Sequence, residues 1–346
     1  MALSSVGLTT QIYNNHIKSV LLLMGFPVLL LLMLASFFGA LNVFTQPQSM
    51  VSGQPVDWNA AVNAATEGLL RYGHWAVLAA GVWFIFAYFF QGQMISAASG
   101  ARPVTRAEYP KLYNMLENLC ISRGLPVPQF EIIDSPALNA FATGLDQKTY
   151  RIVLTRALVE HLPDDELESV IGHELTHIMN RDVRLLVIAV IFVGIISFLA
   201  ELVFRLLING VRPNYYDRDR KNNGIVVIGV ALAVLAIGYI FAIVIRFALS
   251  RKREYLADAG SVELTKNPEA MMRALLRISG QDKVDHMPDS IQQMCIENSS
   301  HFMWIFSTHP PIEDRVKMIS DMTHTPIPEL TASPRPIPTR PWDKNP

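Results

Sequence analysis

The chain is poor in charge, and its charge balance does not point to a nucleic acid. Asp, Glu, Lys and Arg make up 17% of its 346 residues and 51% are hydrophobic, which is unusual for a soluble protein. The formal net charge is −1. The chain also lacks a basic run with interleaved aromatic residues, a Walker loop and a Rossmann glycine pattern. We therefore expect neither a nucleic-acid partner nor a nucleotide site of these common kinds.

Cysteine is nearly absent as well. Cys120 and Cys295 are the only two cysteines, and they lie far apart in the sequence. This spacing predicts neither a disulfide framework nor a zinc site built on cysteine. We expect both to be ordinary buried thiols.

Long apolar segments, by contrast, are plentiful. Four are long enough to cross a bilayer, which takes roughly 20 residues. They cover about residues 20–43, 74–95, 185–204 and 225–245. The first is too long for the apolar part of a typical signal peptide, so we interpret it as an uncleaved anchor. The third carries Glu201 and Arg205 at its far end, and a hairpin that only dips into the bilayer is the alternative there.

Basic residues predict the orientation of these segments. If all four cross, residues 1–18, 98–184 and 251–346 share one side of the membrane. The basic residues near the membrane on that side are Lys18, Arg102, Arg106, Arg181, Arg184, Arg251, Lys252 and Arg253. The positive-inside rule therefore predicts that this side is the cytoplasm. Loop 209–224 disagrees, because it carries Arg212, Arg218, Arg220 and Lys221 on the opposite side.

The most informative motif is H-E-x-x-H at residues 173–177. Residues four apart on a helix share a face, so His173 and His177 can direct two imidazoles at one metal ion, with Glu174 beside them to act on water. A helix is predicted from residue 163 onward, because proline and acidic residues cluster at its start. Apolar residues follow at helical spacing: Leu167, Val170, Ile171, Leu175 and Ile178. This context argues against a chance match.

A third ligand is needed, because catalytic zinc usually takes three protein ligands and keeps one position for water. Glu254 and Asp258 are again four apart on a predicted helix. Glu254 is the candidate ligand, and Asp258 the candidate acceptor for the far nitrogen of a ligating histidine. His177 lies eight residues before the third segment, and Glu254 lies eight residues after Arg246 at the end of the fourth, about 12 Å along a helix in each case, so an antiparallel hairpin would bring them level. The alternative is a charged face that flanks the membrane, with Glu254 paired to Arg251 or Lys252.

Residues 98–162 are typical of a small α+β unit. Residues 108–123 have helical periodicity, and 130–133 and 151–155 predict short strands. Between those strands the run N-A-F-A-T-G contains a candidate edge strand: Asn139, Ala140, Phe141 and Ala142. An exposed edge strand can hold an extended peptide through its backbone without reading sequence. An ordinary strand and turn is the alternative.

A weaker candidate pair lies further along, where His309 precedes two prolines and Arg315 follows. His309 is a candidate donor to a developing oxyanion, and Arg315 a candidate for orienting that region. A purely structural histidine is the alternative for His309.

Together these motifs resemble the HtpX-like membrane zinc metalloproteases, relatives of the zinc-dependent CAAX prenyl proteases. The matching segments are 139–144, 165–182, 253–258 and 307–311, and the resemblance covers roughly residues 105–320. It implies that His173, His177 and Glu254 bind one Zn²⁺ per chain. It also implies that Glu174 is the catalytic base, that the N-A-F-A-T-G strand pairs with substrate, and that His309 and Arg315 lie near the active site. In bacteria such proteins resemble inner-membrane quality-control proteases that act from the cytoplasmic side.

We therefore expect an α-helical membrane protein with a zincin-like α+β catalytic domain, about four transmembrane helices, and an active-site helix leading into the third. We expect a pair of transmembrane helices at residues 1–97, followed by the first part of the catalytic domain at 98–184. A transmembrane hairpin at 185–249 separates it from the second part at 250–323, and a Pro-rich, disordered tail follows at 324–346. The expected activity is that of a zinc endopeptidase that cleaves unfolded or membrane proteins. The alternatives are a non-catalytic metal-binding or chaperone-like membrane protein and a narrow-specificity CAAX-type processing protease.

Overall fold

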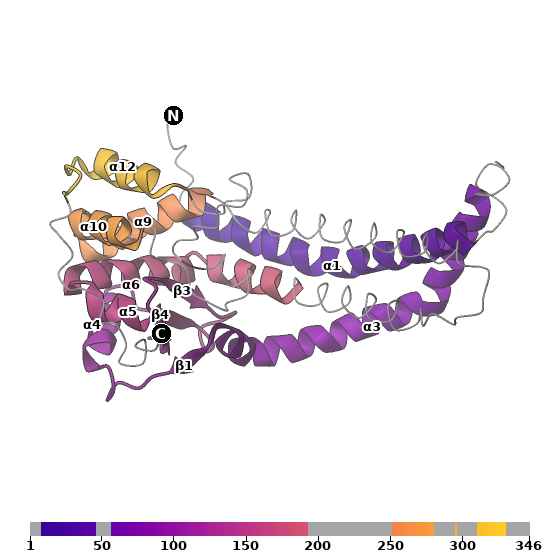
Figure 1. Ribbon diagram of the computed structural model, residues 1–346, viewed down its shortest axis with the longest axis horizontal. Coiled ribbons are helices and arrows are strands. Elements are labelled where there is room, and N and C mark those ends of the chain that lie inside the picture. The colour runs from indigo at the N-terminus through magenta and orange to yellow at the C-terminus, as the bar shows by residue number, and fades with distance from the viewer. Residues whose placement is uncertain (1–7, 46–56, 193–250, 280–294, 296–309, 330–346) are drawn as a thin grey trace, which may run out of the picture. The chain divides into compact units, whose positions relative to one another are not determined.

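The computed structural model describes residues 8–45, 57–192, 251–279, 295 and 310–329 (Figure 1). The chain divides into two compact units. The long-helix unit comprises residues 18–89 and 188–245, and the mixed unit comprises residues 1–17, 90–187 and 246–346.

Two long helices contain the apolar segments expected at residues 20–43 and 74–95. Helices α1 (Leu8–Thr45) and α3 (Trp58–Ser99) are long and apolar enough to cross a membrane, over Tyr13–Gly39 and Trp58–Ser99. Large apolar side chains on them point outward: Met24, Leu70 and Phe89 are 71%, 78% and 69% exposed. Such a surface suits lipid, whereas in water it would favour association.

The third expected segment begins with a helix over residues 182–192, which follows α6 (Asp164–Met179) across a two-residue turn. Phe192, the last described residue of this helix, stacks on Phe26 of α1, with ring centroids 4.1 Å apart. The remainder of that segment, the fourth segment and the basic loop 209–224 lie outside the described residues. The described residues therefore contain two candidate crossing helices, where about four were expected in the whole chain.

The mixed unit contains a four-stranded sheet with the order β1-β2-β4-β3. Its strands are β1 (Ala101–Pro103), β2 (Gln129–Ile133), β3 (Ala140–Thr143) and β4 (Arg151–Thr155). β2 and β4 pair in parallel at the centre, and β1 and β3 are antiparallel at the two edges. The strands expected at 130–133 and 151–155 are confirmed as β2 and β4. β1 was not expected, because three residues ending in proline carry no strand pattern, although proline is tolerated at a sheet edge.

Helices supply most of the core of the mixed unit. Besides α6 they are α4 (Pro110–Ile121), α5 (Arg156–His161), α9 (Arg251–Thr265), α10 (Pro268–Ile278) and α12 (Ile312–Thr323). Helix α6 begins with three acidic residues, where the helix dipole favours negative charge. Helices α10 and α12 share one apolar cluster, made of Met271, Met272, Leu275, Ile312, Val316 and Ile319. The tail residues 325–329 form neither helix nor strand, and 330–346 lie outside the described residues.

The close packing of α6 against α9 decides where the site lies. Gly260 of α9 faces Thr176 of α6 with no room for a Cβ, and Gly172 of α6 faces Ser261 of α9. The Ser261 hydroxyl donates a hydrogen bond to the Ser169 carbonyl of α6, at 2.5 Å. Two glycines on facing surfaces thus allow the backbones to approach each other. Helix α6 lies between α9 and the sheet strand β3 (Figure 1).

Candidate metal centre

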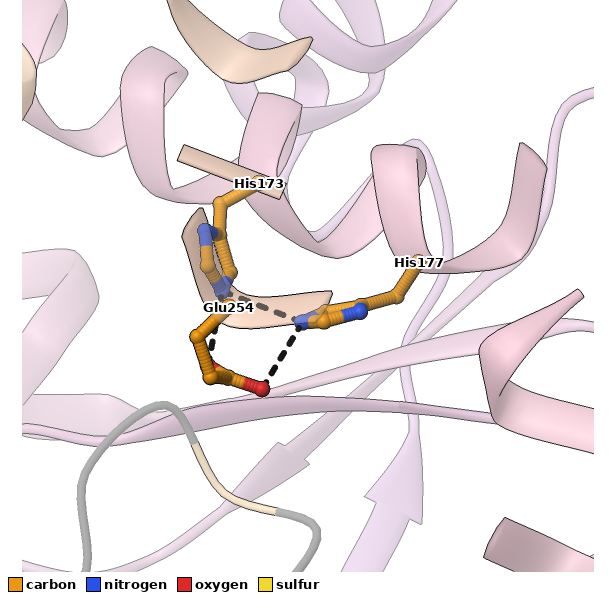
Figure 2. A group of neighbouring side chains, drawn as sticks. All are labelled: His173, His177 and Glu254. Carbon is orange, nitrogen blue, oxygen red and sulfur yellow. Dashed lines mark hydrogen bonds and ion pairs between the residues drawn. The ribbon is translucent and has the colours of Figure 1, made fainter. Parts of the chain in front are cut away.

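Three metal-ligating side chains meet between α6 and α9. His173 and His177 lie one turn apart on α6, and Glu254 comes from the first turn of α9 (Figure 2). Their candidate ligand atoms all lie within 4.8 Å of one another. The two histidine Nε2 atoms are 3.2 Å apart. The Glu254 oxygens lie 3.8 Å from Nε2 of His173 and 3.7 Å from Nε2 of His177.

This donor set fits a zinc ion. Two imidazole nitrogens and one carboxylate oxygen are a common ligand set for catalytic zinc, which keeps a further position for water or substrate. The side chains of His173, His177 and Glu254 are 0%, 12% and 8% exposed, and a carboxylate so buried needs positive charge beside it. The burial of Glu254 beside the two histidines argues against the alternative of a charged face that flanks the membrane.

His173 is held from behind by a buried ion pair. Its Nδ1 lies 3.0 Å from Oδ1 of Asp258, one turn after Glu254 on α9. Arg315 of α12 donates two hydrogen bonds to the same carboxylate, from Nε to Oδ2 at 2.9 Å and from Nη2 to Oδ1 at 2.6 Å. Burial would raise the pKa of Asp258, but the Arg315 guanidinium overcomes this and lowers it. Burial lowers the pKa of His173 to about 4, so its ring is neutral, as a metal ligand must be.

His177 has its own carboxylate partner, Asp182, just beyond the end of α6. The distance from Nδ1 of His177 to Oδ2 of Asp182 is 3.2 Å. Burial would lower the pKa of His177, but Asp182 and Glu254 overcome this and raise it to about 9. Asp182 was not among the site residues predicted from the sequence. It lies five residues after His177 in the sequence, and this spacing becomes informative only because a turn after α6 returns the Asp182 carboxylate to the His177 ring.

Glu174 lies beside the donor set and is 1% exposed. Burial raises its pKa to about 7. The backbone N–H of Ala142 in β3 donates a hydrogen bond to its carboxylate. Glu174 therefore connects the donor set with the edge strand of the sheet.

The edge strand expected from N-A-F-A-T-G is β3, at one end of the sheet. Asn139 exchanges hydrogen bonds with Thr155 beyond the end of the strand pair, at 3.0 and 3.1 Å. Because antiparallel pairs alternate, the backbone groups of Ala140 and Ala142 face away from β4. The strand is nevertheless not exposed to solvent. Asn139, Ala140, Phe141 and Ala142 are only 1–3% exposed.

Two predicted site residues remain, Arg315 and His309. Arg315 contacts Asp258, and its Nη1 lies 4.0 Å from the Glu254 carboxylate. It thus lies behind the donor set, whereas the sequence had predicted only that it lies near the active site. His309 lies outside the described residues.

The chain is similar to known proteins over most of its length. Residues 106–323 match the model of peptidase family M48. A curated relative from Bacteroides fragilis (strain YCH46), described as a protease HtpX homolog, is 42% identical over 329 residues, which cover 91% of this chain and 98% of the relative. Relatives with the same description from Tropheryma whipplei (strain TW08/27) and Streptococcus uberis are 37% and 36% identical. The matched regions cover 71% and 76% of this chain, and 84% and 92% of the two relatives.

One solved structure, the crystal structure of S. mikatae Ste24p, is distantly similar. Its TM-score is 0.44 at 21% identity, over 72% of this chain and 60% of that chain. A likeness of this size has no bearing on the side chains of the site.

Proposed function

The chain belongs to peptidase family M48 and is a membrane metalloprotease, as its motifs predicted, and on this premise we propose that it is a zinc endopeptidase that cleaves misfolded or membrane proteins. The observation that carries the proposal is the cluster of His173, His177 and Glu254 with Glu174 beside it. The first three residues hold one zinc ion, and Glu174 is the general base. Zinc bound there supplies Lewis acidity toward water and toward a carbonyl oxygen.

Glu174 moves the proton in this proposal. A general base works best when its pKa lies near the operating pH, and burial raises the pKa of Glu174 to about 7. Its carboxylate accepts a proton from the attacking water and returns it to the leaving amine. The Ala142 N–H bonded to this carboxylate restrains it on the side toward β3.

We assign substrate binding to β3. The outward N–H and C=O of Ala140 and the outward C=O of Ala142 would pair with an extended peptide, and Asn139 and Phe141 fix the strand on the sheet side. Backbone pairing reads no side chains, which suits a protease for unfolded polypeptides. Because these residues are buried, the edge must be uncovered before a peptide can pair with it.

We assign positioning roles to Asp258 and Arg315. Asp258 lies 3.0 Å from Nδ1 of His173 and would accept its N–H, so that Nε2 keeps its lone pair for the metal. Arg315 keeps Asp258 charged and correctly oriented. His309 remains our candidate donor to the oxyanion, from its place in the sequence motif.

We also propose that the site faces the cytoplasm from a bacterial inner membrane. The support is the excess of Lys and Arg flanking the apolar segments on the side of the motif, including Lys18 and Arg102.

The test is cleavage of an unfolded protein such as casein by the full chain in detergent. Wild type and Glu174→Gln are compared after chelation, with and without added zinc. Glu168→Gln is the matched control, because Glu168 lies on the same helix and is only partly buried. We expect zinc-dependent cleavage by wild type and by Glu168→Gln, and a loss of at least about 100-fold in Glu174→Gln.

Equal cleavage by wild type and Glu174→Gln would overturn the base assignment. If none of the proteins cleaves casein but wild type cleaves a prenylated C-terminal peptide, the broad-specificity proposal gives way to a CAAX-type processing protease. Zinc binding without cleavage of either substrate would favour a non-catalytic metal-binding protein.

A further inference from the structure

We propose that Asn15, in the first turns of α1, is a positioning residue for the metal centre, acting through Asp182 on His177. The N-terminal helix would then complete the site as well as enter the membrane. The inference rests on the proposed function in one respect, namely that His177 is a metal ligand.

Asn15 is a buried amide that binds two parts of one turn. Its Nδ2 lies 2.6 Å from Oδ1 of Asp182 and 3.0 Å from the backbone carbonyl of Asn180, so it donates to both. Asn15, Asn180 and Asp182 are each at most 1% exposed. A single side chain, distant in sequence, therefore holds both the carboxylate and the backbone of the turn that follows α6.

The turn itself needs such support. Helix α6 ends at Met179, and Arg181 has a φ of 59°, a left-handed conformation that side chains other than glycine rarely adopt. This reversal brings Asp182 back beside His177, five residues earlier. A conformation of this kind persists only where surrounding contacts stabilise it, and the two hydrogen bonds from Asn15 are such contacts.

The two oxygens of Asp182 have separate partners. Oδ2 faces Nδ1 of His177 at 3.2 Å, and Oδ1 accepts from Asn15. With the ring N–H on Nδ1, the Nε2 lone pair of His177 is free for a metal. Arg253 Nη1 lies 3.8 Å from the same Oδ1. Without the Asn15 amide, the carboxylate can turn toward the Arg253 guanidinium and away from His177.

The chain offers a matched control for this residue. Asn14 is the same residue type, one position earlier on the same helix, and it is exposed. A substitution at Asn14 changes the composition of α1 equally and leaves the contact with Asp182 intact.

The experiment measures zinc affinity of the full chain in detergent, by competition with a chromogenic chelator after metal removal. The variants are Asn15→Leu, which keeps the size and removes the donors, Asn15→Ser, which keeps one donor, and Asn14→Leu. We expect a 10- to 100-fold weaker zinc affinity for Asn15→Leu, a smaller loss for Asn15→Ser and no change for Asn14→Leu. The visible spectrum of the Co²⁺-loaded protein should change in Asn15→Leu alone, because it reports ligand geometry. If Asn15→Leu does not fold, Asn15→Ser carries the comparison.

Two results would overturn the inference. One is wild-type zinc affinity in both Asn15 variants. The other is a lower melting temperature of the metal-free Asn15 variants with unchanged zinc affinity and Co²⁺ spectrum, which would mean that Asn15 only packs the helix. If wild type itself binds no zinc, the proposed function fails, and this inference fails with it. That outcome is distinguishable from the other two because it is seen in wild type and not only in the Asn15 variants.

Discussion

Gly260 of α9 lies against Thr176 of α6 so closely that a Cβ on the glycine would come within 2.3 Å of the threonine Cγ2. His173 and His177 belong to α6 and Glu254 to α9. The contact between Gly260 and Thr176 therefore sets the separation between the two halves of the donor set, and a side chain at position 260 would push them apart.

Gly260→Ala should weaken both stability and zinc binding. The added methyl group overlaps Thr176, and overpacking of this kind costs about 1–3 kcal/mol. Gly81→Ala is the control, because a Cβ at Gly81 meets nothing within 4 Å. Thermal unfolding and chelator competition give the two readouts, and a second change, Thr176→Ala, should recover most of the loss. A more stable Gly260→Ala protein with unchanged zinc affinity would show that the helices are not held apart at this point.

Removal of the Arg315 guanidinium should destabilise the fold, because the Asp258 carboxylate stays buried without its partner. Breaking a buried ion pair on one side costs about 3–5 kcal/mol, so we expect a loss of that size in Arg315→Met. Lys317→Met, at an exposed position on the same helix, should change stability by less than about 0.5 kcal/mol. Denaturant unfolding measures both.

The double variant Asp258→Leu with Arg315→Met separates stability from metal binding. Removing both charges should restore most of the stability, since the cost comes from one uncompensated charge. Zinc affinity should stay low, because Nδ1 of His173 then has no carboxylate acceptor. Restoration of both properties together would contradict the positioning role of Asp258.

Metal removal should lower the melting temperature of the wild type. A ligand at about 1,000 times its dissociation constant stabilises the folded state by about 4 kcal/mol, so chelation should lower the melting temperature and zinc should restore it. Glu174→Gln should keep this zinc-dependent shift, and His173→Ala should lose it. His161→Ala is the control, since its ring nitrogen contacts the Ala157 carbonyl on α5, outside the donor set. A full shift in His173→Ala would exclude His173 as a ligand.

The Cys120 thiol should be slow to alkylate in the folded protein. Burial, with the nearby Glu117, raises its pKa from 9.0 to about 11. Two pKa units lower the thiolate fraction at pH 8 about 100-fold, and only the thiolate reacts. In a Cys295→Ser background, the native rate should be at least about 100-fold below the denatured rate and should rise with pH up to about 11. Similar native and denatured rates at pH 8 would contradict this burial.

Features that depend on local periodicity were predicted well from the sequence. The alignment of His173 and His177 follows from the helical repeat alone, and α6 begins where its acidic residues predicted. The strands β2 and β4 were recognised from their apolar, β-branched residues, and β3 was recognised as an edge.

Features that depend on packing between distant segments were predicted poorly. The burial of β3 was missed, because an edge pattern says nothing about what covers the edge. Asp182 and Asn15 carried no signal, since their contact exists only after α6 ends in a left-handed turn and Asn15 lies beside that turn. Arg315 was placed near the site, but its ion pair with Asp258 was not predicted.

The sequence by itself determined the pair of histidines, the glutamate between them and the two described apolar helices, because each depends on residues within one helix. It proposed Glu254 and Asp258 as partners of those histidines but left an alternative open. Only the tertiary structure brings them together and places Asp182 behind His177. The physical reason is that a helical repeat acts over a few residues, whereas the approach of α9 to α6 depends on which surfaces, such as that of Gly260, leave room for contact.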